Sequence, residues 1–157
     1  MALWTPDERP PEPFAGVVTL LGRILLGAIF VLSGLHKVMD PQGTQQYMAA
    51  MGMPWTPFFL VGAIILELAG GISLMLGAWT RIGTAALLVL MIPTTLIFHT
   101  HFADQNQFIH FLKNLSMMGG LVYVWTFGPG RLSLDAGLEQ TNTAMPAWRE
   151  PRSRTGT

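Results

Sequence analysis

Four stretches of mainly apolar residues alternate with shorter polar connections along the chain. We expect these stretches to form helices over residues 17–36, 58–77, 81–99 and 108–127. A helix of about 20 residues rises about 30 Å, which is enough to cross the hydrocarbon layer of a bilayer. The pattern therefore predicts an all-α integral membrane protein, a four-helix bundle with antiparallel up-down topology.

The fourth stretch is the most polar of the four. Residues 115–127 alone are too short to cross a bilayer, so we expect this helix to begin near Phe108. It then carries three polar side chains into the headgroup zone or deeper, namely His110, Lys113 and Asn114.

The segments outside the apolar stretches are rich in proline, glycine and polar residues. Prolines and mixed charges predict flexible tails over residues 1–16 and 136–157, which leaves residues 17–135 as the membrane domain. No basic segment with a cleavage site precedes the first apolar stretch, so we expect it to be retained rather than removed as a signal peptide. Residues 36–57 favour an ordered loop, with a short amphipathic helix over 44–51 as the alternative.

The distribution of basic residues predicts the orientation in the membrane. Four spans place both termini on one side, with most of the arginines: Arg9, Arg81, Arg131, Arg149, Arg152 and Arg154. The other side carries only Lys37 and Lys113. Because positive residues favour the cytoplasmic side, we expect cytoplasmic termini. All four histidines then lie at the outer face: His36, His99, His101 and His110.

Composition narrows the class of protein further. Half of the 157 residues are hydrophobic, only 11% are charged and the formal net charge is zero, which favours a membrane protein. A neutral chain has no basic face for nucleic acid. There is no cysteine, which excludes disulfides, iron–sulfur ligation, thiolate zinc sites and covalent haem of the c type. A redox centre must therefore be a diffusible molecule, a histidine-held group or a partner's group.

A single carboxylic acid, Glu67, interrupts the second apolar stretch. A charge at this depth costs about 2.5–3.5 kcal/mol on insertion scales, so it is expected to face the bundle interior, a partner charge or a cavity. The residues on its side of the helix are Ala63, Gly70, Gly71 and Leu74. On the first helix one stripe holds Arg23, Gly27, Phe30, Gly34 and Lys37.

We expect Arg23 to form an ion pair with Glu67, because counting from the predicted cytoplasmic ends separates the two by only about 6 Å along the helices. One hypothesis is a buried pair that fixes helix packing. The other is a pair that accepts protons or orients a ligand in a cavity. The two hypotheses do not exclude each other.

At the predicted outer face, His99, Lys113 and Asn114 come from neighbouring helices. An imidazole, an ammonium and an amide could bind a quinone carbonyl and manage its proton, since histidine titrates near physiological pH. The alternative is that these residues are polar side chains that snorkel to the interface. A metal held by His99, His101 and His110, or a histidine-ligated haem, is a weaker alternative.

Over residues 17–135 the sequence resembles the DoxX family of small four-helix membrane proteins, and in particular its YqjF-like inner-membrane members. The resemblance rests on the order and spacing of Arg23 with Gly34 and Lys37, Thr44-Gln45-Gln46-Tyr47-Met48, Met51-Gly52, Pro54, Glu67-Leu68-Ala69-Gly70-Gly71, Leu76-Gly77, Thr80-Arg81, His99, Lys113-Asn114, Gly119-Gly120, Gly128-Pro129-Gly130, Ser133 and Asp135. It implies a multi-pass protein of the bacterial inner membrane. Family members are named as subunits of a thiosulfate:quinone oxidoreductase or quinol oxidase, which implies an oxidoreductase role.

Together these observations predict a quinone-linked redox membrane protein, or a subunit of one, with a polar pocket inside the membrane. The residues expected to bind the cofactor are Arg23, Lys37, Glu67, His99, Lys113 and Asn114. We expect no covalent cofactor and no metal, contact with the lipid bilayer, and partner subunits or a second copy of the chain. The alternative is a non-catalytic accessory or scaffold subunit, and a small-solute transporter is a third hypothesis.

Overall fold

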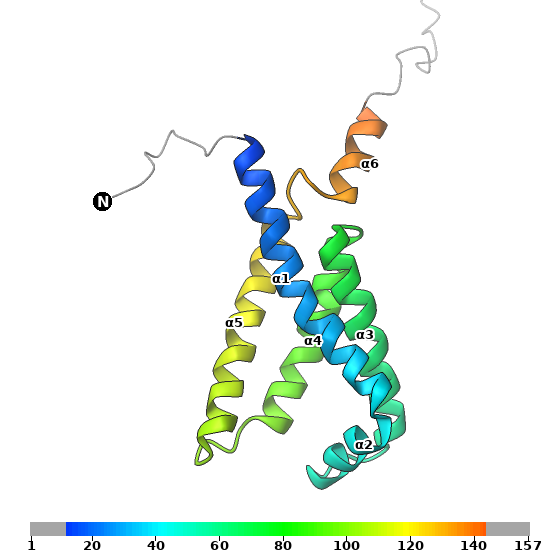
Figure 1. Cartoon of the computed structure of the whole chain (residues 1–157), viewed down its shortest axis with the longest axis vertical. Helices are drawn as coiled ribbons and strands as arrows, with labels where there is room; N and C mark the ends of the chain where they lie inside the picture. Colours follow the sequence, from blue (N-terminus) through cyan, green and yellow to red (C-terminus); the bar gives the residue numbers. More distant parts are fainter. Residues whose placement is uncertain (1–11, 144–157) are drawn as a thin grey trace, which may run out of the picture.

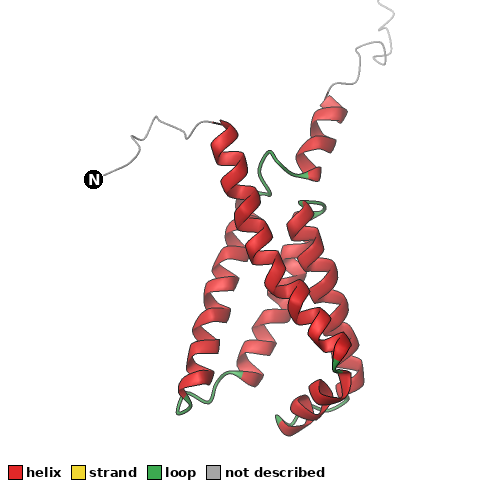
Figure 2. Cartoon of the chain, viewed as in Figure 1, coloured by secondary structure: helices red, strands yellow, loops and turns green. Residues whose placement is uncertain are grey.

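The computed structural model describes residues 12–143, and the regular structure in that range is entirely helical (Figure 2). It contains α1 (Glu12–Met39), α2 (Pro41–Ala50), α3 (Thr56–Leu76), α4 (Thr80–Phe98), α5 (Gln105–Phe127) and α6 (Leu134–Thr143). The prediction of an all-α protein is therefore confirmed for the described residues.

Three helices are long and apolar enough to cross a membrane. These candidate spans are Pro13–Met39 in α1, Thr56–Leu76 in α3 and Thr80–Phe98 in α4. They cover the first three predicted spans. The helix α5 has 23 residues but is more polar, so its role as a fourth span stays a prediction.

The helices pack so that the molecule has two distinct ends. Helix α1 packs along α3, α3 along α4 and α4 along α5, while α2 lies against α3 and the last part of α1. What we call the terminal end holds the start of α1, the α3–α4 turn and α6 (Figure 1). What we call the pocket end holds α2 and the α4–α5 loop (Figure 1).

Two helices extend into the predicted tails. Helix α1 begins at Glu12, five residues before the predicted boundary, because Pro13 lies in the first turn, where no intrahelical donor is needed. Helix α6 occupies Leu134–Thr143, so it begins at the end of the predicted membrane domain and extends into the tail predicted over 136–157; Asp135 holds it to the α3–α4 turn. The rest of both predicted tails, residues 1–11 and 144–157, lies outside the described residues.

The connection between the first two spans is also a helix rather than the expected loop. The Asp40 side chain accepts a hydrogen bond of 2.9 Å from the Gly43 backbone N–H and so caps the start of α2. Pro41 occupies the first helical position, which its fixed φ favours. The alternative of a short helix over 44–51 was therefore closer to the structure.

Glycines let α1 and α3 approach closely. A Cβ atom on Gly27 would lie 2.6 Å from Met75 Cγ and 2.8 Å from the Gly71 carbonyl oxygen. A Cβ atom on Gly34 would lie 2.8 Å from Leu68 Cδ2. The predicted inward faces are confirmed, because these residues are all buried: Arg23, Gly27, Phe30 and Gly34 on α1, and Ala63, Glu67, Gly70, Gly71 and Leu74 on α3.

A network of polar contacts ties the terminal end together. The Asp135 carboxylate accepts hydrogen bonds from Trp79 N (2.8 Å), Thr80 N (3.0 Å) and Thr80 Oγ1 (2.8 Å), so α6 caps α4. Arg23 is 1% exposed and donates to the carbonyl oxygens of Leu74, at 3.2 Å, and Leu132. This network joins α1, α3, α4 and the segment that leads into α6.

The close approach of α1 and α3 predicts the effect of adding one methyl group. Gly27→Ala should destabilise the protein by about 1–3 kcal/mol, because the new methyl meets the backbone of Gly71. Gly22→Ala is the matched control on the same helix, since no heavy atom lies within 4 Å of its Cβ position. Thermal unfolding in detergent measures both, and equal melting temperatures in the two variants would contradict this packing.

Asp135 predicts a loss of stability in acid. Burial raises the pKa of its carboxyl, but hydrogen bonds from Thr80 and Trp79 and the charge of Arg23 lower the pKa by more, so it lies below the ordinary 3.8. Because the pKa is lower in the folded state, ionised Asp135 stabilises the fold. This contribution is complete at pH values well above 3.8 and is lost as the pH falls through the folded-state pKa. Asp135→Asn should cost about 1 kcal/mol near neutral pH, because the amide keeps only one of the two acceptor oxygens and loses the negative charge. The melting temperatures of variant and wild type should converge in acid; a constant difference would contradict this role.

Candidate functional site

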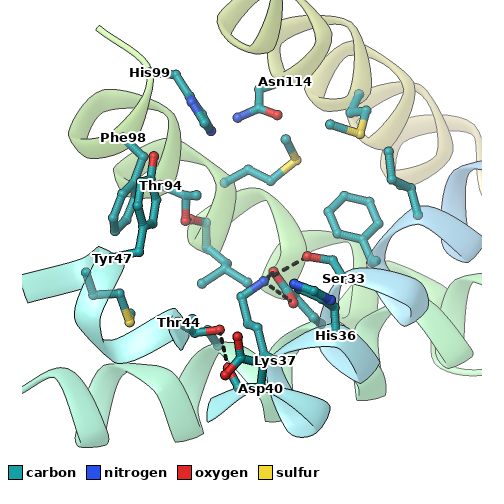
Figure 3. Close-up of a pocket in the computed structure, with 18 of the residues that line it drawn as sticks. Ser33, His36, Lys37, Asp40, Thr44, Tyr47, Thr94, Phe98, His99 and Asn114 are labelled. Carbon is teal, nitrogen blue, oxygen red and sulfur yellow. Dashed lines mark hydrogen bonds and ion pairs between the residues drawn. The ribbon is translucent and has the colours of Figure 1, made fainter. Parts of the chain in front are cut away.

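An ion pair between α1 and α3 forms one wall of the site. Lys37, near the end of α1, donates from Nζ to both oxygens of Glu67 at 2.9 Å. It also donates to Ser33 Oγ, one turn earlier on α1, at 2.8 Å (Figure 3). The side chains of Lys37 and Glu67 are only 21% and 10% exposed. Each of the three ammonium hydrogens of Lys37 therefore has an acceptor.

The predicted pair between Arg23 and Glu67 is wrong. Contacts between α1 and α3 run in reverse order, so that Gly34 lies against Glu67 and Arg23 lies against Gly77. Arg23 is therefore about three helical turns from the level of Glu67. The prediction treated the helix ends as level, but α1 continues well beyond the end of α3. Lys37, on the same stripe as Arg23, is the partner of Glu67.

The ion pair faces a cavity of about 510 Å³, which we call the polar pocket. Its walls come from α1, α2, α3, α4 and α5. The side chains that give it its polar character are Ser33, His36, Lys37, Asp40, Thr44, Tyr47, Glu67, Thr94, His99 and Asn114. Figure 3 shows His99 and Asn114 on one side of the pocket and Ser33, His36 and Lys37 on the other.

His99 and Asn114 are held in place by neighbours. His99 Nδ1 lies 2.8 Å from Gln107 Oε1, and its ring stacks on His110 with 5.2 Å between centroids. With the amide oxygen of Gln107 as the acceptor, Nδ1 carries the hydrogen and Nε2 of the neutral ring is an acceptor. Asn114 Nδ2 donates to Thr95 Oγ1 at 3.0 Å. These contacts fix both side chains at the pocket.

Helix α2 covers the pocket from the side. Its Tyr47 ring stacks on Phe98 of α4 at a centroid distance of 5.5 Å, and Met48 is buried next to it. Ser33, Asp40 and Tyr47 also line the pocket, but they were not among the site residues predicted from the sequence. Two signals were available: Ser33 precedes Lys37 by one helical turn, and Asp40-Pro41 is a typical helix start.

The structure brings together four of the six predicted site residues, Lys37, Glu67, His99 and Asn114. Arg23 instead lies in the network at the terminal end. Lys113 is exposed on α5 and does not line the polar pocket, because it lies on a different side of the helix from Asn114. Among the described residues, no three His, Asp or Glu side chains are arranged to hold a metal ion.

Comparison with known proteins places this architecture in a family. The profile of the DoxX family matches residues 18–100. The inner membrane protein YqjF of Escherichia coli K12 is 37% identical over 119 residues, which cover 76% of this chain and 90% of YqjF. The inner membrane protein YphA of the same organism is 33% identical over 125 residues, covering 76% of this chain and 89% of YphA.

A shorter match reaches a protein with a redox name. CatD of Bacillus subtilis, whose name assigns it provisionally to the oxidoreductases, is 39% identical over 64 residues, covering 41% of this chain and 46% of CatD. No solved structure gives a significant match. The family profile, the inner membrane relatives and the three apolar spans agree: the chain belongs to the DoxX family and is a multi-pass protein of the bacterial inner membrane.

Proposed function

We propose that the chain is a quinone-linked redox membrane protein, or a subunit of one, and that it binds the quinone head group in the polar pocket. The observation that carries this proposal is the convergence of an ion pair, an imidazole and an amide on one cavity in a membrane protein. Polar side chains at membrane depth usually line a ligand site or pair with one another, and here two of them pair on the wall of a cavity.

The two polar sides of the pocket suit a ring with oxygens at opposite positions. His99 and Asn114 lie on one side, and Lys37 and Ser33 on the other (Figure 3). A quinone presents a carbonyl acceptor at each end. The Ser33 hydroxyl, whose oxygen accepts from Lys37, can donate to one carbonyl, and the second amide hydrogen of Asn114 can donate to the other. Phe30 and Met91 also line the pocket and supply apolar surface for the ring. The pocket is large enough for such a ligand, since small-molecule sites are about 300–1,000 Å³.

His99 gives the site a group that can exchange a proton with the ligand. Its Nε2 is an acceptor when Nδ1–H faces Gln107, so it can take the proton of a quinol hydroxyl. Oxidation of a quinol to a quinone releases two protons and two electrons. We assign to this chain the binding of the ring and the handling of protons, and to a partner redox protein the electrons. The provisional oxidoreductase name of CatD supports a redox role.

The finer topology is part of the proposal. At 23 residues, α5 is about 34 Å long and can serve as the fourth span, with His110 and Lys113 near one end. The chain is then an antiparallel four-helix bundle with both termini on one side. The described arginines Arg81 and Arg131 lie toward the terminal end and Lys37 toward the pocket end, which favours cytoplasmic termini. The polar pocket would then lie in the outer half of the membrane.

The proposal predicts that a short-chain quinone stabilises the purified protein. At a concentration about 100 times Kd the gain is about 2.7 kcal/mol, which thermal unfolding in detergent detects as a rise in melting temperature. His99→Ala should weaken binding of the reduced form, the quinol, about tenfold, because it removes the Nε2 acceptor of a quinol hydroxyl, a hydrogen bond worth about 1 kcal/mol or more. His101→Ala is the matched control, since His101 is exposed and does not line the pocket.

The same experiment separates the proposal from a non-catalytic scaffold. The alternative draws support from the ion pair itself, because Lys37 and Glu67 join α1 to α3. If the protein is a scaffold, Glu67→Gln should lower the melting temperature. Added quinone should then leave the melting temperature of the wild type and of every variant unchanged. A quinol-induced rise that is equal in wild type and His99→Ala would show that the ligand binds elsewhere and would remove the proposed site.

A further inference from the structure

A second cavity shares a wall with the polar pocket. It has about 380 Å³ and lies between the end of α2, α3 and α4; we call it the apolar groove. The residues that line both cavities are Met48, Ala63, Leu90, Thr94 and Phe98. The two cavities are therefore adjacent, and the small side chain of Ala63 lies on the wall between them.

The apolar groove differs from the polar pocket in its chemistry. Its own lining consists of Met51, Gly52, Met53, Pro54, Phe59, Pro93 and Ile97. Of the described residues that line it, only Thr94 has a polar side chain, and its Oγ1 donates to the Leu90 carbonyl oxygen at 2.8 Å. A hydrocarbon chain suits such a surface, because it needs no hydrogen bond, whereas a polar group would lose its water without a replacement.

The groove opens toward lipid. Phe59 and Ile97, at its outer side, are 43% and 41% exposed, and Pro93 is exposed between them. Phe59 belongs to the candidate span Thr56–Leu76, and Pro93 and Ile97 belong to Thr80–Phe98. Exposed apolar residues within membrane spans face the acyl chains. The groove thus connects the lipid-facing surface of α3 and α4 with the wall of the polar pocket.

We infer that the ligand is an amphiphile whose ring occupies the polar pocket and whose hydrocarbon tail lies in the apolar groove and reaches the lipid between α3 and α4. This inference rests on the proposed quinone site and specifies its ligand as a lipid-soluble, tailed quinone. The adjacency of the two cavities carries it: they share five lining residues, polar side chains are concentrated in one, and the lining of the other is almost entirely apolar. A tailed ligand can then enter from the membrane without passing through water.

The test compares two quinones with the same ring, one without a tail and one with a decyl tail, on the full-length protein in lipid nanodiscs. Ile97→Trp fills the groove, and Leu96→Trp is the control, since Leu96 is exposed on the same helix and lines neither cavity. Partition of the decyl quinone into lipid is the same for every variant, so differences between variants report contacts with the protein.

We expect Ile97→Trp to weaken binding of the decyl quinone about tenfold, which corresponds to overpacking by about 1.4 kcal/mol. The affinity for the tailless quinone should stay unchanged. Leu96→Trp should change neither affinity. Equal decyl affinity in wild type and Ile97→Trp, or an equal loss for both quinones, would overturn the inference. Absence of tailless binding to the wild type would instead remove the proposed function.

A second measurement keeps the inference testable if Ile97→Trp does not fold. A quinone with a photoreactive diazirine at the end of its tail is irradiated on the wild-type protein, and the labelled residues are identified by mass spectrometry. Labels on residues 51–54 or on Phe59 and Ile97 support the tail position. Labels confined to Ile29 or Met117, which line the polar pocket on α1 and α5, would overturn it.

Discussion

The ion pair between Lys37 and Glu67 is the constraint on which the pocket end depends. A charged group at membrane depth without a partner is costly, and each of these two residues removes that cost for the other. The pair therefore fixes the register of α1 on α3 at the point where the polar pocket begins. It also keeps two charges on the wall of a cavity that a ligand can reach, instead of burying them between closely packed helices.

The two ends of the molecule differ in what their polar side chains contact. At the terminal end, Arg23 and Asp135 bind backbone groups of neighbouring segments, and Arg23 lies close against Gly77. At the pocket end, α2 and α5 surround a cavity instead of packing to fill it. Glycines such as Gly27 and Gly71 bring α1 and α3 together between these ends. The polar contacts of the terminal end thus join helices to one another, whereas those of the pocket end line a cavity.

Much of this architecture could be predicted from the sequence, because apolar length and helical periodicity report directly on membrane helices. The inward position of Glu67 followed from the cost of a charge in lipid, and the small residues beside it identified the packed face. Its partner could not be identified in this way, since Arg23 and Lys37 share one stripe and only the relative height of the helices distinguishes them. That height depends on how far α1 extends past the end of α3, where Arg23 lies beside Gly77, and the apolar pattern of a single sequence does not report it.

Other features depend on tertiary contacts that a single sequence does not reveal. Helix α6 is fixed by Asp135 on a turn 55 residues away along the chain. His99, Lys113 and Asn114 were all predicted to bind the ligand because of their chemistry. Lys113, however, lies on the exposed side of α5. Residues such as Tyr47 contribute to the site only because α2 is a helix and stacks on α4.

The most direct test of this account is the distance between Lys37 Nζ and the Glu67 carboxyl carbon in a lipid bilayer. Solid-state NMR can measure it with nitrogen-15 on lysine and carbon-13 on the glutamate carboxyl. The chain has only two lysines, so Lys113→Arg leaves a single lysine signal. The account predicts a strong dipolar coupling, as contacts of 2.9 Å require, that disappears in Glu67→Gln. A Lys37 signal with no coupling to a glutamate carboxyl would contradict it.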